Sequence, residues 1–168
     1  MSQIVEVRVG GQSGADRGGM DAAQACGVAV RGWCPAGGWA EDYPTPPGVL
    51  KLYPQLVETP SADVAQRTEW NIRDSSCCLV LNSRARGISH GTDIGYALYA
   101  RYETPYHEIT IDGDTSLEAQ IDAACEWLES LDDDAIVLGI GGPRASECAV
   151  AYEVAYHVVE SLIARLSQ

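Results

Sequence analysis

The sequence predicts an α/β fold of three layers, with a mostly parallel sheet between two layers of helices. Short apolar runs typical of buried strands alternate with amphipathic helical stretches along the whole chain. Three of the turns that lead from a strand into a helix contain glycine together with Ser, Thr or Arg. Because ligands of such folds bind beyond the carboxyl ends of the strands, these turns are the first candidates for a functional site.

Length and composition restrict the possible classes of protein. A chain of 168 residues fits a single domain spanning 1–168 with a sizeable core. The net charge of −13 argues against non-specific nucleic-acid binding. The sequence has no secretory signal pattern and no apolar run near the ~18 residues of a membrane span, so we expect a cytoplasmic protein without membrane contact. None of the six cysteines forms a C-x-x-C pair, which indicates reduced thiols rather than disulfides or a zinc site.

The first candidate turn follows a predicted strand over residues 4–9 and opens a helix that should reach about Cys26, with Gly27 after it. Backbone N–H groups at a helix start favour an anion, and a serine there can cap the helix or donate to a phosphate. The candidate ligand contacts are Gly11, Gln12, Ser13, Gly14, Asp16 and Arg17. The spacing matches neither the dinucleotide fingerprint nor the P-loop, so a tight turn without a ligand stays open as an alternative.

The next region contains a long loop and a helix. Residues 32–48 are rich in Gly and Pro, and loops of this length are often functional. Trp33 and Trp39 could stack on a planar ligand or simply pack the loop onto the body. Ser61 is a plausible N-cap for a helix through Arg73. On that helix Arg67 and Asn71 share one face with Asp74, either in a structural ion-pair network or in contact with a ligand.

The second candidate turn follows a continuously apolar strand at 77–81. Asn82 and Ser83 stand at its carboxyl end, and Gly91, Thr92 and Asp93 open the following helix, so these five residues are candidate ligand contacts. Tyrosines at 96, 99 and 102 then recur every three residues, a pattern typical of a subunit interface or the edge of a core.

The third candidate turn follows a predicted strand at 108–111, an acidic helix with a solvated face near 117–131 and a buried strand at 135–140. Its candidate contacts are Gly142, Pro143, Arg144 and Ser146, and a helix with a broad apolar stripe follows over 150–166. The three turns should meet at one end of the sheet. An acidic protein that keeps arginines in its loops, at positions 17, 84, 86 and 144, is suited to a small anion.

Several stretches resemble the molybdenum cofactor carrier family. They are G-G-Q-S-G-A-D-R-G at 10–18, G-W-C-P-A-G-G-W-A-E-D at 32–42, E-T-P-S-A-D at 58–63, Q-R-T-E-W-N-I-R-D at 66–74 and G-P-R-A-S-E at 142–147. The resemblance covers nearly the whole chain in order. It implies a Rossmann-like fold related to the lysine-decarboxylase-like (LOG) proteins and a homo-tetramer. It also implies a protein that binds molybdenum cofactor, shields it and passes it between cofactor-biosynthesis proteins and molybdoenzymes.

The residues suit that cargo, a pterin with a terminal phosphate and an oxo-molybdenum dithiolene. Arginine and helix N-termini would hold the phosphate. Asn71, Asn82, Asp16 or Trp33 could contact the pterin. Cys34 lies in a predicted loop, so capture of the metal by its thiolate is a minor alternative.

The rival classes are an enzyme and a nucleotide-sensing module. LOG phosphoribohydrolases carry a P-G-G-x-G-T-x-x-E loop whose glutamate takes part in cleaving nucleoside monophosphates. The corresponding stretch here keeps Gly91 and Thr92 but has Gly95 in place of the glutamate, so we expect no enzyme activity, although Asp93 could act instead.

Overall fold

The computed structural model describes residues 2–84 and 87–167, so Arg86 lies outside the described part of the chain. In that part, five parallel strands form one sheet in the order β2-β1-β7-β5-β6. The strands are β1 (Gln3–Arg8), β2 (Ala29–Arg31), β5 (Cys77–Asn82), β6 (Tyr106–Thr110) and β7 (Ala135–Gly141). The predicted parallel sheet is therefore confirmed.

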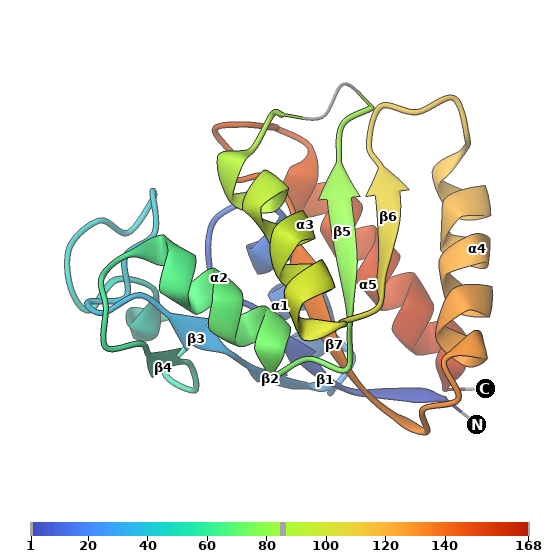
Figure 1. Cartoon of the computed structure of the whole chain (residues 1–168), viewed down its shortest axis with the longest axis horizontal. Coiled ribbons are helices and arrows are strands. Elements are labelled where there is room, and N and C mark those ends of the chain that lie inside the picture. The colour runs from blue at the N-terminus through green and yellow to red at the C-terminus, as the bar shows by residue number, and fades with distance from the viewer. Residues whose placement is uncertain (1, 85–86, 168) are drawn as a thin grey trace.

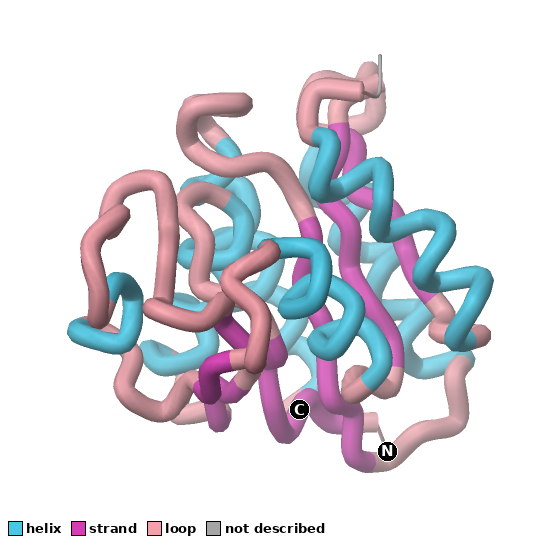
Figure 2. The backbone as a smooth tube through the Cα atoms, turned by 60° about the vertical axis from the view of Figure 1, so that its left-hand side comes forward, coloured by secondary structure: helices cyan, strands magenta, loops and turns pink. Residues whose placement is uncertain are grey.

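Helices cover both faces of this sheet. α1 (Ala15–Ala25), α4 (Leu117–Ser130) and α5 (Ala151–Leu166) pack together on one face, and α2 (Val64–Arg73) packs with α3 (His90–Tyr102) on the other. Figure 2 shows the strands between the two layers of helices. The three-layer, Rossmann-like architecture predicted from the alternation of strands and helices is confirmed.

The strand order is that of a doubly wound fold read from a different starting strand. If β7 is counted first, followed by β1, β2, β5 and β6, the order across the sheet becomes 3-2-1-4-5. The two chain ends, which a chain starting at β7 would join, lie next to each other in Figure 1. The strand order therefore reverses between β7 and β5, which is where ligands of doubly wound folds bind.

The long segment between β2 and α2 is an ordered unit on the opposite side of the molecule from α4 (Figure 1). β3 (Trp33–Cys34) pairs with β4 (Val57–Glu58), and a 3-10 helix, η1 (Gly48–Lys51), lies between them. Trp33 packs edge-on against Trp70, and its indole Nε1 donates to Asp74 at 2.8 Å. Trp33 therefore fastens this segment to α2, as the packing interpretation of the two tryptophans proposes.

Burial follows the predicted apolar pattern. The β5 strand is buried along its whole length, and Leu162 of α5 is fully buried in the main core. The acidic helix α4 buries Ile121 and Leu128. Its acidic stripe is exposed as predicted, and Glu118 and Asp122 both pair with Arg165 of α5 at the surface.

Two predicted helix caps are wrong. The N-cap of α2 is Asp63, whose carboxylate accepts from Ala65 N, whereas Ser61 helps to hold the turn before it by accepting from Asp63 N. At α1, Gly14 occupies the N-cap position, and the hydroxyl of Ser13 points to a different partner described below. Local sequence signals cannot show that a tertiary partner is competing for the same hydroxyl.

The tyrosine stripe of α3 forms the edge of a small core rather than a free surface. Tyr99 is buried against Ile72 and Val80, with Tyr96 and Tyr102 packed on this cluster. The ring of Tyr99 stacks on that of Tyr106 with centroids 4.8 Å apart.

Across the described residues, every helix is too short or too polar to cross a lipid bilayer.

We expect Gly14→Ala to destabilise the fold more than Gly27→Ala does. Both glycines have positive φ, at 79° and 73°, so alanine strains the backbone by roughly 1–3 kcal/mol at either site. At Gly14 a Cβ would also lie 2.4 Å from the carbonyl oxygen of Pro143, whereas at Gly27 nothing described lies within 4 Å. Urea denaturation measures both losses, and equal losses would show that the contact between the first and third turns is not tight.

Candidate functional site

A pocket lies between the sheet and the α2–α3 layer, below the carboxyl ends of the central strands. All three candidate turns contribute to its wall, through Gln12, Thr92 and Gly142. These turns follow β1, β5 and β7, which are adjacent in the sheet. The pocket is therefore at the reversal of strand order, and the three turns converge as the sequence predicts.

The pocket carries buried polar atoms that lack a protein partner. Within the described residues, Gln12 Nε2, Arg67 Nε, Thr92 Oγ1 and Arg8 Nε have no hydrogen-bond partner, and all four residues line the pocket. Each of these atoms can donate a hydrogen bond. Buried donors are normally satisfied, so four of them around one pocket indicate a ligand rich in acceptors.

The orientation of the Gln12 amide is fixed by its surroundings. Its Oε1 accepts from the backbone N–H groups of Ser13 and Glu41, both at 3.0 Å. Because backbone N–H groups can only donate, the amide oxygen must face them, and Nε2 is left as the unpartnered donor.

A buried ion pair links the first turn to α2. Asp16 Oδ2 accepts from Arg67 Nη1 at 3.1 Å and from Gln12 N at 3.2 Å. Complete burial raises the pKa of Asp16, and the nearby Arg67 guanidinium opposes this rise. Gly10 permits the close approach, since a Cβ there would lie 2.1 Å from Arg67 Nη1.

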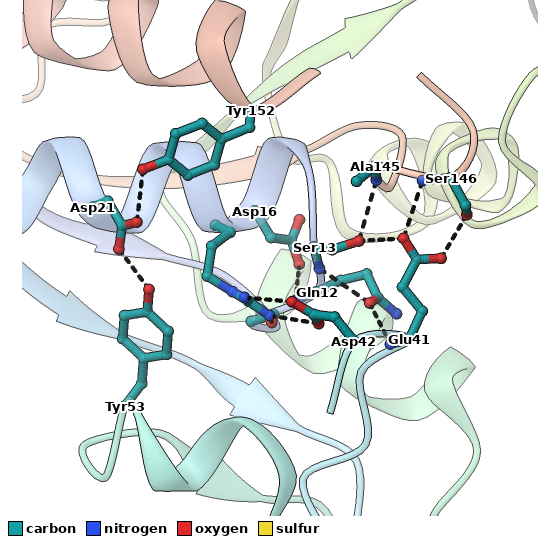
Figure 3. A network of polar contacts seen from close by, with 12 residues as sticks. Gln12, Ser13, Asp16, Asp21, Glu41, Asp42, Tyr53, Ala145, Ser146 and Tyr152 are labelled. Atoms are coloured by element: carbon teal, nitrogen blue, oxygen red, sulfur yellow. Dashed lines mark hydrogen bonds and ion pairs between the residues drawn. The ribbon is translucent and has the colours of Figure 1, made fainter. Parts of the chain in front are cut away.

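The first and third turns hold an anion that the protein supplies itself. Figure 3 shows the Glu41 carboxylate accepting from the hydroxyls of Ser13 and Ser146, and Ser146 N donates to it at 3.1 Å. Ser13 Oγ in turn accepts from Ala145 N at 3.1 Å. Partial burial opposes ionisation of Glu41, but these hydrogen bonds together with Arg144 outweigh it and lower the pKa of Glu41.

Arg17 also binds a carboxylate of the protein itself. Its two terminal nitrogens contact the Asp42 carboxylate at 2.9 and 3.1 Å, and Nη2 also donates to the carbonyl oxygen of Gly11. Glu41 and Asp42 together therefore fasten the long loop to the first turn. Two side chains predicted to bind a ligand anion, Ser13 and Arg17, bind carboxylates of the protein in this structure.

The candidate residues at the end of β5 and after it divide into two groups. Asn82 donates to the hydroxyl of Tyr96, and Ser83 donates to Asp112, so both point away from the pocket. Ser89 is the N-cap of α3 and accepts from Thr92 N. Thr92 itself faces the pocket.

The predicted site residues accordingly fall into two sets. Those that line the pocket are Gln12, Asp16, Arg67, Asn71, Gly91, Thr92, Gly142 and Arg144. Those that lie outside its described lining are Gly11, Ser13, Gly14, Arg17, Asn82, Ser83, Asp93, Pro143 and Ser146. Asn71 lines the pocket, but its side-chain amide is bonded to the backbone of Trp33. Its Oδ1 accepts from Trp33 N at 2.8 Å, and its Nδ2 donates to Trp33 O at 2.9 Å.

Sequence reasoning missed several lining residues, chiefly Arg8, Cys78, Ser89 and Tyr99. One signal for Arg8 was available, because Glu6 and Arg8 place two charges on one face of a strand that should be buried on both. The signal for Tyr99 was its helical spacing from Thr92 and Gly95.

The pocket has a volume of about 70 Å³, well below the ~300 Å³ of typical small-molecule sites. A phosphate or one ring edge can enter it as it stands, and a larger ligand would extend from its mouth or widen it.

Direct capture of a metal has little support. Among the described residues there is no group of three or more His, Cys, Asp or Glu side chains placed to hold a metal ion. Cys34 lies buried in β3 rather than in an accessible loop, and burial raises the pKa of its thiol to about 11. Thiolate attack from Cys34 is therefore disfavoured.

We expect Glu41→Gln to destabilise the protein by about 1 kcal/mol at neutral pH, because three donors lose an ionised acceptor. Since folding lowers the pKa of Glu41, the ionised group stabilises the fold above about pH 4.3, and this stabilisation is lost as the pH falls through the lowered value. Urea denaturation at neutral pH and at a pH below the lowered pKa should show that the difference in free energy of unfolding between wild type and Glu41→Gln disappears in acid.

The matched control is Glu126→Gln, which removes the same charge at an exposed position of α4. If Glu41→Gln and Glu126→Gln behaved alike at neutral pH, Glu41 would not fasten the loop.

Comparison with known proteins supports the fold and identifies the family. The chain aligns with 29% identity to a crystal structure from Syntrophus aciditrophicus SB, named "Putative molybdenum carrier protein". The alignment covers 96% of each chain, with a TM-score of 0.83. A search of curated protein sequences found no match.

A family model, the circularly permutated YpsA SLOG family, matches residues 7–163. The permutation in its description accords with a sheet whose strands read 3-2-1-4-5 from β7 onwards. On the strength of this match over nearly its whole length, the chain belongs to the circularly permuted YpsA SLOG family.

Proposed function

We propose that this protein binds molybdenum cofactor in the pocket between β7 and α3 and carries it without chemical change. It would receive the cofactor from biosynthesis proteins and pass it to molybdoenzymes, as a homo-oligomer. The similarity to a protein named as a molybdenum carrier supports this cargo.

The observation that carries the proposal is the set of unpartnered donors. Gln12 Nε2, Arg67 Nε and Thr92 Oγ1 surround the pocket, each within a few residues of the start of a helix, α1, α2 and α3 respectively. A phosphate or a pterin carbonyl supplies the acceptors that these groups lack. Half-buried Arg144 also lines the pocket, where its guanidinium pairs with Glu147 at 3.5 Å.

The absence of an acidic side chain at position 95 supports carriage rather than catalysis. Gly95 lines the pocket where LOG-type hydrolases, which the sequence resembles, would place a glutamate. The nearest acidic group on the same helix, Asp93, lies outside the described lining of the pocket.

A nucleotide is the second candidate ligand, and the same donors favour it. A nucleoside monophosphate also offers a phosphate and a flat ring rich in acceptors. An anaerobic titration of the purified protein with molybdenum cofactor, run in parallel with AMP, separates the two. Tight binding of the cofactor with weak AMP binding supports the carrier, and the reverse order leaves a nucleotide-binding protein.

We expect Thr92→Val to weaken cofactor binding about five- to tenfold while leaving the free protein as stable or more stable. The hydroxyl lacks a protein partner, so removing it costs the free protein little, whereas the complex loses one hydrogen bond. Titration and thermal melting measure the two effects.

The control is Thr59→Val, which removes a buried hydroxyl that does have partners, the carbonyl oxygens of Cys34 and Ser61. It should destabilise the fold by about 1 kcal/mol and leave affinity unchanged. Unchanged affinity in Thr92→Val would remove Thr92 from the binding site.

We also expect the purified protein to release no free base from nucleoside monophosphates, because Gly95 stands where LOG-type hydrolases would place their glutamate. Chromatography of AMP after prolonged incubation would detect adenine. Turnover that disappears in Asp93→Asn would contradict the carrier assignment and identify Asp93 as the catalytic group.

A further inference from the structure

The pocket-facing stripe of α3 runs from small residues at the mouth to one large residue inside. Gly91, Thr92, Gly95 and Tyr99 all line the pocket and recur at helical spacing. Tyr99 is 4% exposed and is fixed by the stacked ring of Tyr106. Its side chain therefore has little freedom to leave the pocket.

The hydroxyl of Tyr99 occupies the space beside position 95. A Cβ built on Gly95 would lie 3.2 Å from the Tyr99 hydroxyl, and a Cβ built on Gly141 of β7 would lie 3.1 Å from it. The hydroxyl thus bridges the gap between helix and sheet, in the direction that a side chain at position 95 would take.

This hydroxyl belongs to a residue that lines the pocket, and the described protein does not use it. Within the described residues none of the hydrogen bonds involves it, in contrast to the hydroxyls of Tyr96 and Tyr102, which contact Glu108 and Glu69. Burial raises the pKa of Tyr99 well above its ordinary value, so the group stays a neutral phenol at physiological pH. A neutral phenol can donate a hydrogen bond but is a poor acceptor of a proton.

We propose that Tyr99 binds the cargo directly, with its hydroxyl donating to an acceptor on the ligand ring from the place where a hydrolase would present its carboxylate. The inference rests on the proposed function, since it assigns a ligand contact within the same pocket. The proposed contact gives a physical reason for binding without cleavage. The Tyr99 hydroxyl holds the ligand as a donor, while position 95 offers no carboxylate to act as a base.

The test compares Tyr99→Phe with wild type in anaerobic titrations with molybdenum cofactor. We expect affinity to fall about five- to tenfold, the loss of one neutral hydrogen bond. The melting temperature of the free protein should stay close to wild type, because the hydroxyl has no partner in the described structure. The stabilisation that the cofactor adds on binding should shrink.

Two further variants serve as controls for the role of Tyr99. Tyr102→Phe removes a hydroxyl from the same helix that contacts Glu69 instead of the pocket, and should keep wild-type affinity. Gly95→Ala places a methyl group 3.2 Å from the Tyr99 hydroxyl and so displaces it, while alanine favours the helix. It should lower affinity even if Tyr99→Phe folds poorly, and a thermal melt of the free variant measures the cost of crowding the Tyr99 ring, which Tyr106 holds in place.

The outcomes separate the inference from the function on which it rests. If wild type binds the cofactor and both Tyr99→Phe and Gly95→Ala bind equally well, the role of Tyr99 is wrong and the carrier function stands. If wild type binds AMP but not the cofactor, the cargo is wrong, and a fall in AMP affinity in Tyr99→Phe would still support the contact. If wild type binds neither, both proposals fail.

Discussion

The buried pair of Asp16 and Arg67 is the interaction on which the pocket depends. It joins the first turn of α1 to the middle of α2 across the carboxyl end of β1, and it also holds the backbone of Gln12. Breaking a buried pair leaves one charge unsatisfied, at a typical cost of ~3–5 kcal/mol. The same contact orients Arg67 so that its Nε remains available at the pocket wall.

The glycine-rich turns serve two purposes that a sequence pattern cannot separate. On one side, the first and third turns bind the carboxylate of Glu41, and Arg17 binds that of Asp42. These contacts with the protein's own carboxylates hold the long loop in place. The other side faces the pocket through Gln12 and Arg144. Anion-binding chemistry is therefore present at both sides. In the described residues four unpartnered donors belong to residues that line the pocket, and one, Arg17 Nε, lies on the other side.

The fold could be predicted because its signals are local: apolar strands, amphipathic helices and glycine at the turns between them. The site was predicted only in part. Gln12, Arg67 and Thr92 follow from their turns and helix face, whereas Ser13 and Arg17 were assigned to a ligand because the loop that brings Glu41 and Asp42 to them lies about 25 residues further along the chain. Such pairing over a long separation has no local signature. Tyr99 was interpreted as an edge of the core, which it is, and its place in the lining of the pocket appears only when β7 is placed opposite α3.

The most direct test of the account is a crystal structure of the protein grown anaerobically with molybdenum cofactor. The account predicts the cofactor between the β7 turn and the start of α3, with acceptors within hydrogen-bond distance of Gln12 Nε2, Arg67 Nε and Thr92 Oγ1. A cofactor bound elsewhere, for example in place of Glu41 on Ser13 and Ser146 with those three donors still unpartnered, would contradict it.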